Sequence, residues 1–206
     1  MSQKTITLIM TGASGAQYGL RLLEQLLAGQ HRVYLLMSRP AQLVINTETE
    51  LKLPGRAKDI QAYFTELYQA ASGQLQVFER EQWMAPIASG TSVSDATVVC
   101  PCTTGTLSAI ACGSSRNLLE RAADVALKEK KPLILVVRET PFSEIHLENM
   151  LKLARMGSTI LPANPGFYNQ PQSVNDLVDF IVARILDHLH VPHQLTPRWG
   201  SVVATI

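Results

Sequence analysis

TITLIMTGASGAQYG, residues 5–19, predicts a β-strand, a tight glycine turn and a helix in immediate succession. The strand is a short apolar run rich in β-branched residues, and it ends abruptly at Gly12 and Gly15. Glycines permit backbone conformations closed to other residues, and the first amides of a helix attract an anion. The stretch therefore predicts phosphate or nucleotide binding at the first strand of an α/β sheet. The alternative is a glycine turn that only connects a strand to a helix.

The glycine spacing narrows the choice of nucleotide. Gly12, Gly15 and Gly19 match neither the G-x-G-x-x-G fingerprint nor the P-loop. A P-loop ATPase is therefore disfavoured. A short-chain dehydrogenase is disfavoured as well, because no tyrosine in the chain is followed by a lysine four residues later.

Composition fits one globular domain. The 206 residues are 46% hydrophobic and 17% charged, and the net charge of +1 argues against a nucleic-acid binder with a broad basic surface. No apolar run approaches the ~18 residues of a membrane span, and the N-terminus lacks a signal-peptide pattern. We expect a cytoplasmic protein with one domain, 1–206, whose tail from about residue 191 packs on the site or on a neighbouring subunit.

Cysteine and histidine patterns give no metal site. Cys100, Cys102 and Cys112 include no C-x-x-C pair, and we interpret them as small apolar residues near the end of a buried strand. His188, His190 and His193 fall at the end of the last predicted helix, where imidazoles suit the negative end of the dipole. We therefore predict no bound metal.

The rest of the chain alternates strands and helices. Strands are predicted at 32–37, 75–78, 96–100, 133–137 and 159–161, with helices at 41–46, 59–71, 118–129, 143–156 and 173–190. This alternation predicts a three-layer, doubly wound parallel sheet of Rossmann or flavodoxin-like type.

Polar residues follow several predicted strands where the ligand crevice of such a sheet lies. Ser38 follows one strand, Thr103 to Thr106 follow another, and Arg138 and Glu139 follow a third. Ser38 has two readings, a phosphate or ribityl ligand and a helix cap. Two hydroxyl and glycine turns in one chain predict a crevice that holds an extended, phosphate-bearing ligand.

Basic and aromatic residues elsewhere have weaker patterns. Arg121 and Lys128 lie on one helix stripe, suited to a second phosphate, although solvent exposure is the commoner fate. Arg184 falls in line with an apolar stripe of its predicted helix. Its guanidinium therefore needs an anionic partner, or its side chain must extend to the edge of the stripe. The segment from Trp83 through Ser89 and Gly90 to Ser94 reads equally as surface, ligand wall or subunit contact.

Five motifs in the same order carry a family resemblance that runs essentially end to end. They are the G-A-S-G-A-x-Y-G turn, P-C-T-T-G-T-L-S at 101–108, R-A-A-D-V-x-L-K-E at 121–129, V-R-E-T-P at 137–141 and P-x-x-P-x-F-Y-x-x-P-Q-S at 162–173. The chain thereby resembles the UbiX-type flavin prenyltransferases, which are related to the homo-oligomeric flavin-containing cysteine decarboxylases. The resemblance implies transfer of a dimethylallyl group from dimethylallyl monophosphate to N5 and C6 of reduced FMN, without a metal. It also implies closed homo-oligomers, typically dodecamers, and supply of prenylated FMN to a UbiD-type decarboxylase in ubiquinone biosynthesis or aromatic acid decarboxylation.

The resemblance also assigns residues. FMN binding is implied for Gly12, Ala13, Ser14, Ser38, Thr103, Thr104, Gly105, Thr106 and Arg138. The prenyl-phosphate clamp is implied for Arg121, Lys128, Tyr168 and Arg184, with main-chain donors at Ser89 and Gly90. Glu139 takes the place of an acid that protonates the leaving phosphate, Glu48 and Ser14 form a pair that handles the N5 proton, and Trp83 and Trp199 wall the prenyl pocket. Composition alone gives Glu48 no distinction.

Three rivals remain. The cysteine decarboxylases use an early histidine and a P-x-M-N-x-x-M loop, whereas this chain has no such histidine and reads Pro162-Ala163-Asn164-Pro165-Gly166-Phe167. Direct FMN-dependent decarboxylation of an aromatic acid stays open. A non-enzymatic flavin carrier would make the charged clamp superfluous.

Overall fold

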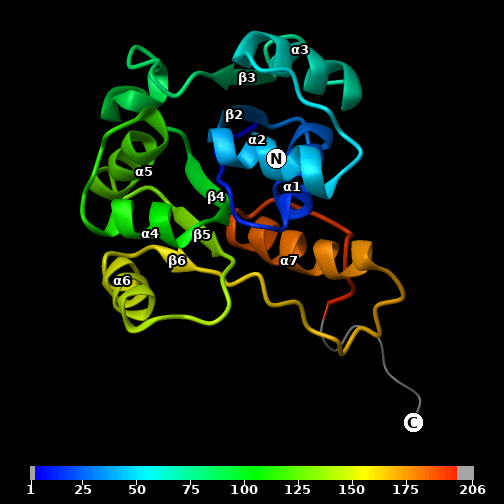
Figure 1. Ribbon diagram of the computed structural model, residues 1–206. Helices are drawn as coiled ribbons and strands as arrows, with labels where there is room; N and C mark the ends of the chain where they lie inside the picture. Colours follow the sequence, from blue (N-terminus) through cyan, green and yellow to red (C-terminus); the bar gives the residue numbers. More distant parts are fainter. Residues whose placement is uncertain (1–2, 199–206) are drawn as a thin grey trace.

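A computed structural model describes residues 3–198 and shows one six-stranded sheet (Figure 1). All neighbouring strands are parallel, in the order β3-β2-β1-β4-β5-β6. The strands are β1 (Thr5–Met10), β2 (Arg32–Met37), β3 (Leu75–Phe78), β4 (Ala96–Cys102), β5 (Leu133–Val137) and β6 (Thr159–Ile160). This is the Rossmann strand order, and the prediction of a doubly wound α/β domain is confirmed.

Helices cover both faces of the sheet and give the three layers in Figure 1. One face carries α1 (Ala16–Ala28), α2 (Arg39–Glu48), α3 (Ala57–Leu67) and α7 (Val174–His188). The other carries α4 (Thr104–Ala111), α5 (Leu118–Lys128) and α6 (Glu144–Arg155), with the short 3-10 turns η1 (Pro86–Ala88) and η2 (Gly90–Ser92) beside α5.

The apolar strands are buried because helices cover them on both sides. All five residues of β5 and all seven of β4 are buried. Side chains alternate between the two cores, so Leu8 of β1 packs in one cluster and Ile9 in the other. The continuous apolar runs that predict these strands therefore fill two separate cores.

The order of the sheet reverses at β1, which lies between β2 and β4. In an open parallel sheet, such a switch point leaves a crevice outside the carboxyl ends of the strands. Thr11 fixes this edge: its hydroxyl donates to the carbonyl of Pro101 at 2.8 Å and accepts from the amide of Thr103 at 2.8 Å. The end of β1 is thus tied to the end of β4.

Several predicted boundaries are wrong. Helix α2 runs to Glu48, so this residue ends a helix instead of lying in a polar stretch after it. Strand β4 continues two residues beyond Cys100. Cys100 and Cys102 are buried as expected, whereas Cys112 is exposed at the end of α4. No helix within residues 3–198 has the length and apolarity that crossing a membrane requires.

Candidate functional site

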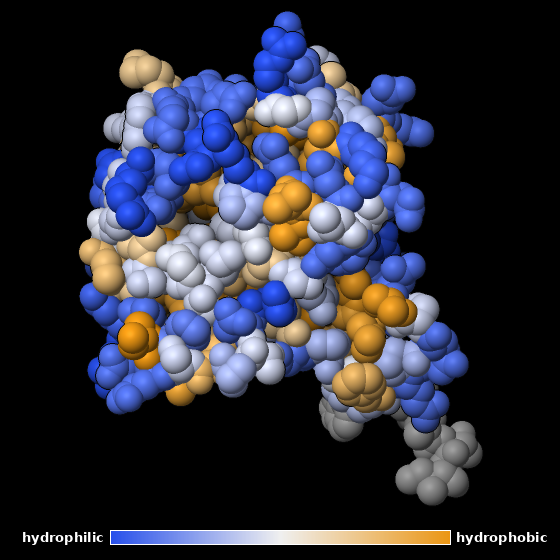
Figure 2. Space-filling view, in the orientation of Figure 1, coloured by the Kyte–Doolittle hydropathy of each residue, from blue (hydrophilic) through white to orange (hydrophobic). Residues whose placement is uncertain are grey.

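A cavity of about 380 Å³ lies at the switch point, where the ends of β1, β2 and β4 meet. Figure 2 shows the hollowed face, with pale side chains of intermediate hydropathy over α4 and the end of β4. The lining includes five of the predicted FMN residues, Gly12, Ser38, Thr103, Gly105 and Thr106, together with Thr11, Pro40, Arg80, Arg116, Asn117, Leu119 and Glu120. The structure therefore gathers turns that lie far apart in the sequence.

The turn after β1 contains an anion that belongs to the chain itself. Gly15 has φ +95°, and its amide donates to Oε2 of Glu48 at 2.8 Å, as does the amide of Ala16 at 3.1 Å. The first amides of α1 are therefore bound by a carboxylate and are not available to a phosphate, contrary to the expectation from sequence. Within residues 3–198, the amides of Gly12, Ala13 and Ser14 have no protein acceptor.

Glu48 is held in its charged form. Burial alone would raise the pKa of its carboxyl, but hydrogen bonds from Ser14, Gly15 and Ala16 and the charge of Arg138 together lower this pKa. Glu48 and Ser14, paired by the resemblance, are therefore neighbours in the structure. Glu48 is therefore deprotonated at neutral pH, but the lowered pKa also makes it a weaker base than an ordinary carboxylate.

The second turn leaves its helix amides open. Thr103 caps α4 by accepting from the amide of Thr106 at 3.1 Å. Within the described part of the chain, the amides of Thr104 and Gly105 have no protein acceptor, as is usual for the first turn of a helix. The first backbone amides of α4 are thus open to a ligand, although the carboxylate of Glu139 lies 3.5 Å from the hydroxyl of Thr104.

Of the two predictions for Ser38, the helix cap is confirmed, and the phosphate or ribityl ligand stays a prediction. Its Oγ caps α2 by accepting from the amide of Ala41 at 3.1 Å, and the residue lines the crevice. A hydroxyl that accepts one hydrogen bond still has its own proton to donate. Ser38 can therefore cap the helix and donate to an oxyanion at the same time.

Arg138 and Glu139 reach the crevice from the end of β5. Nε of Arg138 donates to the carbonyl of Ser14 at 3.2 Å, so the arginine bridges to the turn after β1. The hydroxyl of Thr104 lies 3.5 Å from Oε2 of Glu139, and Oε1 accepts from the amide of Thr140 at 3.1 Å. The ends of β1, β4 and β5 are brought together as predicted.

Sequence reasoning missed the wall formed by residues 114–120. Glu120 is 8% exposed, and its carboxylate accepts from the amide of Arg116 at 2.9 Å and from the side chains of Ser114 and Asn117. Burial raises the pKa of Glu120, but these hydrogen bonds outweigh it and the net pKa is lowered. The Asn-x-x-Glu pattern at 117–120 is a helix-start signature that could have located this wall.

The predicted phosphate clamp falls into two groups. On α5, Arg121 donates through Nε to the carbonyl of Ala88 at 3.0 Å and pairs with Asp124 at 2.9 Å. Gly90 packs against the side chains of Lys128 and Glu129, which form an ion pair with each other. Arg121 and Lys128 therefore lie beside the η1–η2 segment that carries Ser89 and Gly90.

The second group lies across the sheet. Tyr168 packs edge-on against Phe180 of α7 with ring centroids 5.6 Å apart. Arg184 is exposed and pairs with Asp187 at 2.8 Å, so it reaches the edge of the molecule and does not lie within the apolar stripe. Because α5 and α7 cover opposite faces, one chain does not bring the two groups together.

The structure describes one of the two predicted pocket tryptophans and part of the predicted tail. Trp83 is 45% exposed, and the neighbouring Met84 is almost fully exposed. Trp199 lies outside the described residues. Of the predicted tail, Val191 joins the core and Leu195 lines a small cavity with Gly166 and Phe180, close to the loop that carries Tyr168.

The buried thiols of Cys100 and Cys102 are unreactive. Burial raises the pKa of Cys102 to about 12 and also raises that of Cys100, so both stay protonated at neutral pH. This agrees with their interpretation as small apolar core residues. Among the described residues, no group of three or more His, Cys, Asp and Glu side chains is arranged to hold a metal ion.

Comparison with known proteins identifies close relatives. The family model described as Flavoprotein matches residues 1–186. The flavin prenyltransferase UbiX of Pseudomonas aeruginosa is 62% identical over 196 residues, which cover 95% of this chain and 94% of that protein.

Two solved structures share the fold over their full length. The structure of AnUbiX (PadA1) in complex with FMN and dimethylallyl pyrophosphate has a TM-score of 0.86 at 36% identity and covers 98% of this chain and 100% of its own. A dodecameric FMN-dependent Ubix-like decarboxylase from Escherichia coli O157:H7 has a TM-score of 0.83 at 39% identity, covering 96% and 100%.

Proposed function

The chain belongs to the flavoprotein family of UbiX-type flavin prenyltransferases, and we propose that it joins a dimethylallyl group from dimethylallyl monophosphate to N5 and C6 of reduced FMN. The relative solved with FMN and dimethylallyl pyrophosphate supports both ligands. The product would be prenylated FMN, the cofactor of UbiD-type decarboxylases.

The observation that carries the proposal is the crevice at the switch point. Its donors suit a flavin phosphate: the open amides of Gly12, Ala13 and Ser14, the hydroxyl of Ser38 and the N-terminus of α4. Arg138 bridges β5 to the turn after β1 and supplies a fixed positive charge. When bound, reduced FMN supplies a nucleophilic N5 and an electron-rich ring to be alkylated.

The cations of the clamp activate the leaving group. An allylic phosphate departs more readily when fixed positive charges stabilise the developing dianion. Arg121 and Lys128 would hold it from one subunit, and Tyr168 and Arg184 from another, because the two groups lie on opposite faces of a single chain. Trp83 and Trp199 would exclude water and stabilise developing positive charge on the allyl group.

Two carboxylates would move the protons. Glu139, beside Thr104 at the edge of the crevice, would protonate the departing phosphate. Glu48 would accept the N5 proton through Ser14, its hydrogen-bond partner. The lowered pKa keeps Glu48 deprotonated and makes it a weak base, so it would hold the proton only briefly before passing it on.

The clamp divided between two faces favours an oligomer with sites at subunit interfaces. The dodecameric relative supports a closed assembly, and we propose a dodecamer for this chain. We place the protein in the cytoplasm and propose a UbiD-type decarboxylase as the enzyme that receives its product.

Direct decarboxylation is the second candidate, favoured by the description of the Escherichia coli O157:H7 relative as a decarboxylase. The two reactions release different products. Purified protein incubated without oxygen with reduced FMN and dimethylallyl monophosphate should release inorganic phosphate, and oxidised FMN should not support this release. Release of CO2 from an aromatic or cysteinyl acid by this protein alone, without phosphate release from the allyl donor, would support the decarboxylase instead.

A further inference from the structure

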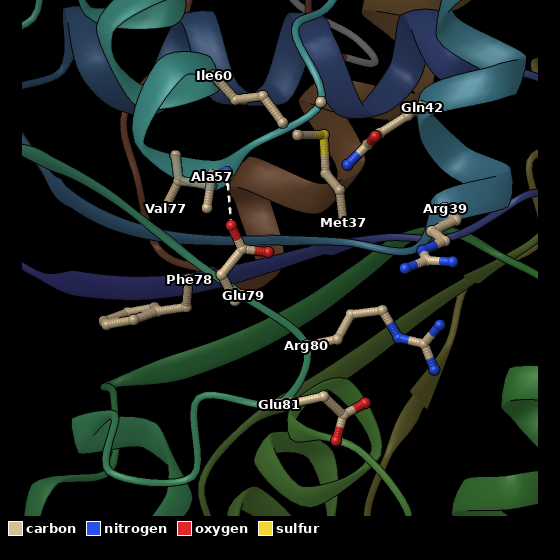
Figure 3. Close-up of a pocket in the computed structure, with 11 residues that line it drawn as sticks. Met37, Arg39, Gln42, Ala57, Ile60, Val77, Phe78, Glu79, Arg80 and Glu81 are labelled. Atoms are coloured by element: carbon tan, nitrogen blue, oxygen red, sulfur yellow. Dashed lines mark hydrogen bonds between the residues drawn. The ribbon is translucent and has the colours of Figure 1, made fainter.

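A second cavity of about 530 Å³ adjoins the crevice at the carboxyl ends of β2 and β3 (Figure 3). Its apolar floor consists of Met37, Ile60 and Val77, all buried. Arg39 and Gln42 of α2 line it on one side, and Arg80 lies just after β3. Arg80 also lines the crevice, so one side chain is shared by both cavities.

Arg39 and Arg80 both line the cavity without a protein partner for their charge among the described residues. Within residues 3–198, neither guanidinium has a hydrogen bond or a carboxylate at ion-pair distance. By contrast, Arg56, next to the cavity residues Gly55 and Ala57, pairs with Asp59 at 3.1 Å. Figure 3 shows both unpaired guanidinium groups on the same side of the cavity. Two positive charges in one cavity repel each other, and an anion bound between them would offset this repulsion.

The two carboxylates of the cavity do not fill this role. Glu79 turns to the other side, where Oε1 accepts from the amide of Ala57 at 2.8 Å (Figure 3). Glu81 is exposed, and within residues 3–198 its carboxylate forms no ion pair with Arg39 or Arg80. The positive groups are therefore left facing the open part of the cavity, above an apolar floor.

We propose that Arg39 and Arg80 form an outer phosphate-binding site for a phosphate group, either free or carried by a small ester. Guanidinium groups bind phosphate oxygens in a bidentate manner, and two of them from different elements can hold one dianion. The choice of phosphate over other anions rests on the proposed function, in which both substrates carry phosphate and inorganic phosphate is released. Through Arg80, the outer site communicates directly with the flavin crevice.

Equilibrium dialysis of FMN-loaded protein against inorganic phosphate tests the site. Filling the crevice with FMN leaves the outer site and the prenyl-phosphate clamp to bind phosphate. Arg39→Met should weaken one class of bound phosphate by about tenfold or more, and Arg184→Met should weaken the other. Arg39→Lys, which keeps the charge but not the fork, should fall between Arg39→Met and the wild type. Arg56→Met is the control and should bind phosphate as the wild type does.

Arg80 gives a sharper signature because it lines both cavities. Arg80→Met should weaken outer phosphate binding and FMN binding, whereas Arg39→Met should weaken phosphate binding and leave FMN affinity unchanged. Equal phosphate binding by the wild type and Arg39→Met, with unchanged thermal stability, overturns the proposal. So does a wild-type protein whose saturable phosphate binding is lost entirely in Arg184→Met.

The Arg184→Met variant, in which the clamp is weakened, shows whether the outer site binds a phosphate ester or free phosphate. Displacement of bound phosphate by dimethylallyl monophosphate assigns the outer site to esters, and binding of inorganic phosphate alone assigns it to the released anion; either result supports the site. Dialysis involves no turnover. Protein that binds outer phosphate but forms no prenylated flavin contradicts the proposed function and leaves this site intact.

Discussion

Oε2 of Glu48 lies 2.8 Å from the amide nitrogen of Gly15, a residue 33 positions earlier in the chain. This contact closes the N-terminus of α1 with a carboxylate from the end of α2. It directs a phosphate ligand away from α1 and toward the open amides of residues 12–14 and of α4. The same carboxylate is the proposed proton acceptor, so one residue both shapes the crevice and takes part in the chemistry.

Glu48→Gln should lower both stability and turnover. The substitution removes the negative charge at the positive end of α1, and we expect a loss of about 1 kcal/mol in the free energy of unfolding. Urea denaturation of the flavin-free protein at matched concentration measures the loss. Glu50→Gln is the control, because Glu50 is exposed nearby. Equal losses in the two variants would contradict the role of Glu48 as a helix cap.

The free energy of unfolding should decrease in two stages as the pH is lowered. The pKa of His31 in the folded protein is lowered from its ordinary 6.5, first by burial and then by the charge of Lys4. Its contribution is complete above pH 6.5 and declines as the pH falls from there toward the folded pKa. The pKa of Glu48 in the folded protein is also lowered, from its ordinary 4.5. The contribution of Glu48 to stability is therefore complete above pH 4.5 and is lost as the pH falls through the folded pKa.

The melting temperature, followed from neutral to acidic pH, separates these stages. Asn at position 31 offers an acceptor for the amide of Lys4, which bonds to Nδ1 of His31 at 3.2 Å, but does not titrate. His31→Asn should therefore remove the decline that begins near pH 6.5 and keep the lower one. An unchanged upper decline in this variant would assign it to another group.

Two crevice glycines should respond differently to alanine. A Cβ at Gly12 would clash with the ring of Pro40 and lie 3.2 Å from its carbonyl carbon, whereas a Cβ at Gly105 would meet only Thr103 Oγ1, at 4.0 Å. We expect Gly12→Ala to cost about 1–3 kcal/mol in the free energy of unfolding. Gly105→Ala should change it little, because alanine is the better helix former. Chemical denaturation measures the free energy of unfolding of both variants. Similar values would show that Pro40 can shift to accommodate the Cβ without loss of stability.

Active sites shared between subunits should be recoverable by mixing. Arg121→Met and Arg184→Met should each be inactive alone. Co-assembled from equal amounts of denatured or co-expressed chains, they should regain about one quarter of the wild-type rate, because that fraction of interfaces pairs an intact Arg121 with an intact Arg184. A mixture as inactive as its parents would place both arginines in one subunit's site or outside the mechanism.

The sequence predicts the elements well because helix and strand periods are local properties. The buried run Leu133–Val137 and the glycine turn at residue 12 are of this kind. Glu48 could not be found from its surroundings in the sequence, since its partners are 32 and 33 residues away. The same holds for Arg80, which lines the crevice and whose carbonyl accepts from the amide of the distant Leu118 at 2.8 Å. Resemblance identified Glu48, but the geometry gives the reason for its charge.

The mass of the flavin after reaction tests the central claim most directly. The purified protein is incubated without oxygen with reduced FMN and dimethylallyl monophosphate, and the flavin is then extracted and analysed by mass spectrometry. The account predicts a flavin heavier by one C5 unit, and correspondingly heavier again when the allyl donor carries deuterium. FMN recovered unchanged, from protein shown to bind it, would contradict the account.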